Sequence, residues 1–139
     1  MTALAFCRND GGRALAGFRG ETRDCVTRAI AIASGRPYDE VYADLGRIGQ
    51  SLGLSRSISR TGVPRPVIDA YLAEIGAVWT PTMTIGSGCR THLTAEDLPS
   101  GRLICRLSRH LVAVINGTIH DTYDPSRGGR RCVYGYWTL

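Results

Sequence analysis

The dipeptide Asn116-Gly117 lies between two alternating runs of residues, and this feature restricts the fold of the chain more than any other. The stretch reads HLVAVINGTIHDTYD. An Asn-Gly pair between two strand-like runs is typical of a β-hairpin with a two-residue type I′ turn. Such a turn places Ile115 opposite Thr118, and every other cross-strand pair follows from that one. The sequence therefore predicts two antiparallel strands with a fixed register.

This register brings a histidine close to an aspartate. His110 is expected opposite Tyr123, and Val112 is expected opposite Asp121. Asp121 then lies diagonally across from His110 on the same face of the hairpin. A one-residue bulge would exchange the two faces and bring Asp124 to this position instead. We favour Asp121, because the choice depends on the turn type and Asn-Gly is typical of type I′.

Helical patterns fill the first half of the chain and strand patterns fill the second half. A loop-rich segment, 1–20, precedes three predicted helices, and the stretch between the second and the third reads as an exposed loop. The helices are expected over 25–35, 36–54 and 64–76, the loop over 51–64, and the strands over 77–83, 102–107, 110–115, 118–123 and 132–139. Helices followed by a run of strands predict one α+β domain over 1–139, with the N-terminal helices packed on a C-terminal antiparallel sheet.

All 17 basic residues of the chain are arginines, and they give a net charge of +5. Arginine pairs with carboxylates and phosphates, so an acidic partner and nucleic acid are both candidate ligands. The arginines are scattered, with no run longer than Arg130-Arg131, which disfavours nucleic-acid binding and favours a solvated basic surface. The opening MTALAFC has no leading positive charge, so we expect no signal peptide, no membrane span and a cytoplasmic location.

The five cysteines are widely spaced and include no C-x-x-C pair. This pattern argues against a disulfide framework, and most of the cysteines are expected to be reduced. Cys7 and Cys132 have no partner that the spacing suggests.

Cys25 directly follows Asp24, the expected N-cap of the first helix. The free amides and the dipole at a helix N-terminus stabilise a thiolate, and the same amides can donate hydrogen bonds to an oxyanion. A histidine beside the sulfur and a carboxylate beside the histidine would complete a nucleophilic site. The competing interpretation is a core cysteine, because Cys25 shares a helix face with Ala29 and Ile32.

Two segments, DCVTRAIA and HLVAVINGTIHDTYDPS, resemble the papain-like cysteine peptidase superfamily, in particular its small bacterial and phage-borne members and the C39-like peptidases. The resemblance in the order of elements covers 21–139. It implies a papain-like fold in which Cys25 is the nucleophile, His110 the general base and Asp121 the residue that orients the histidine. It also implies hydrolysis or acyl transfer at a peptide, isopeptide or amide bond, with a peptide or protein substrate and no cofactor.

Two positions depart from the family pattern. The glutamine expected before the nucleophile is absent from GFRGETRDC, which leaves Arg19, Thr22 and Arg23 as candidates to donate a hydrogen bond to the oxyanion. Val26 follows the nucleophile, where C39-type peptidases have glycine. These departures keep a second hypothesis open, namely a non-catalytic papain-like module that binds an acidic protein or nucleic acid through its arginines.

A zinc site is the rival interpretation of the cysteines and histidines. Cys89, His92, Cys105 and His110 form the spacing C-x2-H-x12-C-x4-H, which tetrahedral zinc could accept. Against this site, Cys105 is expected to lie on the same strand face as Leu103 and Leu107, as a core cysteine does. We therefore expect no metal.

Overall fold

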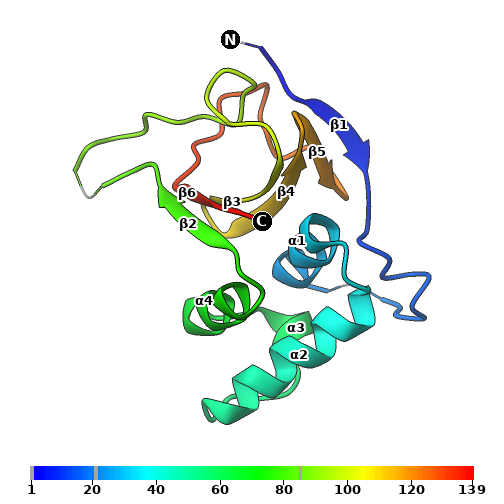
Figure 1. Cartoon of the computed structure of the whole chain (residues 1–139). Helices are drawn as coiled ribbons and strands as arrows, with labels where there is room; N and C mark the ends of the chain where they lie inside the picture. The colour runs from blue at the N-terminus through cyan, green and yellow to red at the C-terminus, as the bar shows by residue number, and fades with distance from the viewer. Residues whose placement is uncertain (1, 21, 85) are drawn as a thin grey trace.

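The strands of the computed structural model, which describes residues 2–20, 22–84 and 86–139, form one mixed sheet in the order β1-β5-β4-β3-β6-β2 (Figure 1). The strands are β1 (Ala5–Arg8), β2 (Val78–Pro81), β3 (Arg102–Leu107), β4 (His110–Ile115), β5 (Thr118–Asp121) and β6 (Gly135–Thr138). All neighbouring pairs are antiparallel except β1 and β5, which run parallel. The prediction of a purely antiparallel sheet is therefore wrong at the β1 edge. All four residues of β1 are exposed, so no alternation of burial marks this strand in the sequence.

The helices of the described residues are α1 (Cys25–Ser34), α2 (Tyr38–Ser51), α3 (Ile58–Thr61) and α4 (Arg65–Glu74). Three of them confirm the predicted helices, whereas α3 lies in the segment that was expected to be a loop. Tertiary contacts hold this single turn: the Ser59 hydroxyl donates to the Tyr42 carbonyl at 2.6 Å, and the Thr27 hydroxyl donates to the Ser59 carbonyl at 2.8 Å. A four-residue helix is too short to show a period in the sequence.

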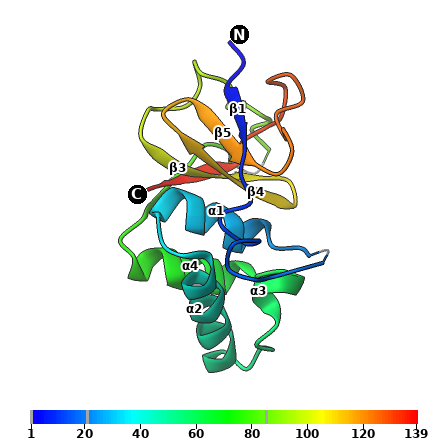
Figure 2. The same cartoon turned by 90° about the vertical axis from the view of Figure 1, so that its right-hand side faces the viewer.

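α1 lies between the sheet and the other helices, so the architecture is α+β with the helices on one face of the sheet (Figure 2). Eight of the ten residues of α1 are buried, which matches its small apolar composition. Gly35 ends the helix in the left-handed conformation at φ 74°, as expected of a C-terminal glycine. Asp24 occupies the N-cap position, but its side chain makes no capping hydrogen bond.

The hairpin has the predicted register and turn. Ile115 pairs with Thr118, and Asn116 and Gly117 have φ values of 46° and 81°, the positive φ at both positions that a type I′ turn requires. Alternate residues of β4 pack on opposite sides of the sheet, with Leu111 and Ala113 in the cluster that includes the helices and Val112 and Val114 in the other cluster. This alternation confirms the predicted faces.

Loops cover the second face of the sheet, and a disulfide bond joins two of them. Cys89, from the loop after β2, is bonded to Cys132, which precedes β6, and Leu93 and Val133 are fully buried nearby in the sequence. The prediction that Cys132 has no partner is therefore wrong. The two cysteines are 43 residues apart, so nothing local in the sequence indicated the pair.

Within 2–20, 22–84 and 86–139, no helix has both the length and the hydropathy that crossing a bilayer requires.

Candidate active site

Three elements bring Cys25, His110 and Asp121 together. Cys25 is the first residue of α1, His110 is the first residue of β4, and Asp121 is the last residue of β5. His110 Nε2 lies 2.6 Å from Asp121 Oδ2, which is the diagonal contact that the hairpin register predicts. The other ring nitrogen, Nδ1, is then left free to interact with the Cys25 thiol, which lines the same cavity as His110. The imidazole therefore lies between the carboxylate, to which it is hydrogen-bonded, and the thiol, whose pKa it influences.

Cys25 is half-buried at the beginning of α1. The first backbone hydrogen bond of the helix runs from the Arg28 amide to the Asp24 carbonyl. The amides of the preceding residues in the first turn therefore have no acceptor within the helix. Burial raises the pKa of the Cys25 thiol, but hydrogen bonds from the His110 ring and the Leu111 amide, together with the charges of His110 and Arg28, outweigh burial and lower the pKa. The surroundings therefore favour the thiolate.

His110 and Asp121 are 8% and 1% exposed, so their contact is shielded from water. Burial alone would lower the pKa of His110, but hydrogen bonds and charges from Asp121 and Cys25 raise it to about 9. Burial would raise the pKa of Asp121, whereas the hydrogen bond and charge of His110, the charge of Arg28 and the Thr122 amide lower it. The arrangement favours an imidazolium beside a carboxylate at neutral pH, and it shifts Cys25 toward the thiolate.

Asp124, the alternative acid, does not reach the histidine. Its side chain is exposed, and its Oδ1 accepts a hydrogen bond from the Ser126 amide at 2.9 Å, which forms a local turn. The ring of Tyr123, the predicted cross-strand neighbour, lies 5.4 Å from the His110 ring between centroids. Asp121, and not Asp124, therefore lies beside His110, as the type I′ register predicts.

Arg28 was not identified from the sequence, yet it joins the site to the beginning of the helix. Its guanidinium donates to Asp24 Oδ1 at 2.5 Å and to Asp121 Oδ1 at 2.9 Å, and the side chain is 10% exposed. Asp24 uses its second oxygen to accept from the Tyr38 hydroxyl at 2.8 Å, which explains why it does not cap the helix. The i,i+4 spacing of Asp24 and Arg28 on an otherwise apolar helix was the available signal.

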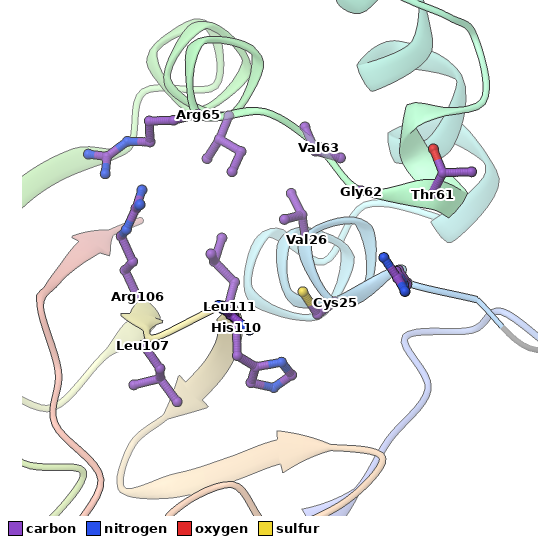
Figure 3. A pocket seen from close by; sticks show the side chains of 13 residues that line it. Cys25, Val26, Thr61, Gly62, Val63, Arg65, Arg106, Leu107, His110 and Leu111 are labelled. Carbon is purple, nitrogen blue, oxygen red and sulfur yellow. The ribbon is translucent and has the colours of Figure 1, made fainter.

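Cys25 and His110 line a cavity of about 330 Å³ between α1, the connection from α3 to α4, and the β3–β4 hairpin (Figure 3). The remaining lining residues combine apolar and cationic side chains. They are Arg23, Val26, Thr61, Gly62, Val63, Arg65, Ile68, Arg106, Leu107, Arg109 and Leu111. A ligand bound in this cavity would therefore lie beside the Cys25 sulfur and the His110 imidazole.

Of the three candidate oxyanion donors, only Arg23 lines this cavity. The Thr22 hydroxyl donates instead to the Arg60 carbonyl at 2.9 Å. Gln50 is the only glutamine in the chain, and it lies in α2, away from the cavity lining. The family's glutamine therefore has no equivalent here, and the donors that remain are the backbone amides of α1 and the Arg23 side chain.

The four residues of the rival zinc site do not form one cluster, although Cys89 Sγ lies 3.6 Å from His92 Nε2. Cys89 is bonded to Cys132, Cys105 is fully buried as a free thiol, and His110 is engaged with Asp121. Within the described ranges, no group of three or more His, Cys, Asp and Glu side chains is arranged to hold a metal ion.

Comparisons of the chain with protein-family models, with curated proteins and with solved structures found no match.

Proposed function

We propose that this chain is a thiol-dependent hydrolase or acyl transferase of papain-like arrangement, acting on a peptide, isopeptide or amide bond. One observation carries the proposal. The His110 imidazole is hydrogen-bonded to the Asp121 carboxylate at 2.6 Å and lowers the pKa of the Cys25 thiol, and the thiol and the imidazole line one cavity. Buried charged groups cost folding free energy unless they are well paired. Packing alone therefore gives no reason to place these three ionisable side chains together.

In the proposed reaction, the Cys25 thiolate attacks the carbonyl carbon, and the electron pair of the C=O bond moves to the oxygen. Amides at the start of α1 and the Arg23 side chain are placed to stabilise this oxyanion. The His110 imidazolium gives its proton to the leaving nitrogen as the C–N bond breaks, which leaves a thioester on Cys25. Water or an amine then attacks the thioester, and His110 takes a proton from this nucleophile. The C–S bond breaks, which releases the acid or the new amide and restores the Cys25 thiolate. Asp121 keeps the imidazole oriented throughout.

The second candidate is a binding module that has lost catalysis, and the absent glutamine is the observation that favours it. That hypothesis predicts association with an acidic protein or nucleic acid that weakens steeply as salt rises. It gives no reason for a histidine with a raised pKa beside a thiol with a lowered pKa.

Alkylation by iodoacetamide tests the proposed function. At pH 6 an ordinary exposed cysteine is almost wholly protonated, because its pKa is about 8.5. Cys25 is expected to react at least about tenfold faster than Cys7, the exposed free thiol, because its thiolate is stabilised. The labelled residue is identified by mass spectrometry under non-reducing conditions, so that Cys89 and Cys132 remain bonded.

The His110→Ala variant should slow labelling of Cys25 at pH 6 by about tenfold or more and leave Cys7 unchanged. His120→Ala is the matched control, because His120 bonds Asn9 and not Cys25. Equal reactivity of Cys25 and Cys7 in the wild-type protein would contradict the proposed function.

A further inference from the structure

The cavity beside Cys25 carries four arginines and no acidic residue among its lining side chains. Arg65 is the first residue of α4 and Arg106 belongs to β3, so the two come from opposite walls. Their guanidinium groups extend toward one another (Figure 3). Such a juxtaposition of like charges is unfavourable in the empty site and favourable once an anion lies between them.

Arg65 is held in place by aromatic and acidic neighbours. Its guanidinium carbon lies 4.5 Å from the ring centroid of Trp79 and 5.0 Å from that of Trp137. Its Nε donates to Asp69 Oδ1 at 2.7 Å. The two terminal nitrogens have no hydrogen bond to another residue of the described ranges, so they are available to a ligand. Stacking fixes the plane of the guanidinium and reduces the entropy lost on binding.

The Arg106 guanidinium has no hydrogen bond or ion pair to any described residue, although its side chain is partly buried. Burial and the charge of Arg65 lower the pKa of Arg106, against the opposing charges of Asp69 and Tyr134. A cation kept partly out of water beside a second cation gains most from an anionic partner.

We infer that the substrate of Cys25 carries a carboxylate close to the bond that is attacked, and that Arg65 and Arg106 bind it. The inference rests on the proposed function and names its substrate class. A peptide supplies this group in two ways, as an acidic side chain or as a free C-terminal carboxylate. Guanidinium groups bind carboxylates through paired hydrogen bonds, and a cavity of about 330 Å³ falls in the range of small-ligand sites.

Three thiol reagents of nearly the same shape, which differ in the presence and position of one carboxylate, test the inference. They are N-iodoacetyl-glutamine amide, which is neutral, N-iodoacetyl-glutamate amide, which has the side-chain carboxylate, and N-iodoacetyl-glutamine with a free α-carboxylate. One or both anionic reagents should alkylate Cys25 about tenfold faster than the neutral reagent, since a charge-assisted hydrogen bond contributes enough for that factor. The faster of the two identifies the source of the carboxylate. Cys7 should show no such preference.

Arg65→Gln and Arg106→Gln should each reduce the preference, measured as the ratio of the anionic to the neutral rate within the same variant, to about twofold or less. Arg90→Gln removes the same charge from an exposed position outside the cavity and should leave the preference intact. Fast alkylation of Cys25 without any preference would overturn the carboxylate site and leave the proposed function standing. Protection of Cys25 from all three reagents by a short oligonucleotide would assign the arginines to phosphates instead and overturn the inference as well.

Slow reaction of Cys25 with all three reagents would overturn the proposed function, and a second measurement then decides the binding site alone. Trp79 and Trp137 are the only tryptophans in the chain, so their fluorescence reports on Arg65. Titration with N-acetyl-glutamate amide, which has the side-chain carboxylate, or with N-acetyl-glutamine, which has a free α-carboxylate, should change this fluorescence in the Cys25→Ser variant and not in Cys25→Ser with Arg65→Gln. N-acetyl-glutamine amide is the neutral control, and equal responses to all three compounds would contradict a carboxylate site.

Discussion

Replacing Asp121 by asparagine is expected to lower kcat/KM for acyl transfer from an activated ester, such as p-nitrophenyl acetate, by about 10³-fold or more. The Asp121 carboxylate accepts the His110 Nε2 hydrogen bond at 2.6 Å and raises the pKa of that histidine. An asparagine of the same shape has no charge to stabilise the imidazolium, and its amide nitrogen can favour the wrong tautomer. The loss should appear mainly in kcat, because Asp121 does not line the cavity.

Asp124→Asn is the matched control, since it removes the same charge three residues later from an exposed side chain. Its kcat/KM should stay within about twofold of the wild-type value. Circular dichroism of both variants shows whether the fold is retained. A folded Asp121→Asn protein with unchanged kcat/KM would contradict the role proposed for this carboxylate.

Replacing Arg28 by methionine is expected to lower the free energy of unfolding at pH 7 by about 3–5 kcal/mol. Methionine keeps much of the apolar stem but leaves the carboxylates of Asp24 and Asp121, which are 2% and 1% exposed, without their shared cation. Removing one member of a buried ionic network costs more than the network contributes, because the remaining charges stay buried. Urea denaturation followed by circular dichroism measures the change.

The effect of Arg28→Met should depend on pH in a defined direction. The pKa of Asp121 in the folded protein is lowered, partly by Arg28, so this carboxylate contributes stability above its unfolded pKa of about 3.9 and loses it as the pH falls through the folded value. The difference between wild type and variant should therefore be largest at neutral pH and shrink under acid conditions. Arg36→Met, at an exposed pair with Glu40, is the control and should cost less than about 1 kcal/mol. A pH-independent loss would show that packing, and not charge, accounts for the effect.

The parts of the fold that were predictable are those with local signals. Alternation on both sides of Asn116-Gly117 predicts the hairpin register, and this register places Asp121 beside His110, as the structure has it. Helical spacing and Gly35 likewise located α1 and therefore Cys25 at its start. Local patterns do not predict that Cys25 lies beside His110, because this proximity depends on how α1 packs on the sheet.

The parts that were not predictable depend on partners distant in the sequence. β1 pairs with a strand that lies more than a hundred residues later, as Phe6 with Ile119 shows, and its own residues carry no alternation. The disulfide between Cys89 and Cys132 and the buried position of Arg28 are also tertiary facts. An isolated arginine on an apolar helix indicates a buried partner, but it does not identify which carboxylate approaches from the sheet.

Nitrogen NMR of the labelled His110 ring measures directly whether Cys25 and His110 form a thiolate–imidazolium pair. We predict a doubly protonated ring at pH 7.5 that loses its proton near pH 9, and a lower pKa after Cys25 is alkylated, because the thiolate charge has been removed. A neutral His110 ring at pH 7.5, with a pKa that alkylation of Cys25 does not change, would contradict the account.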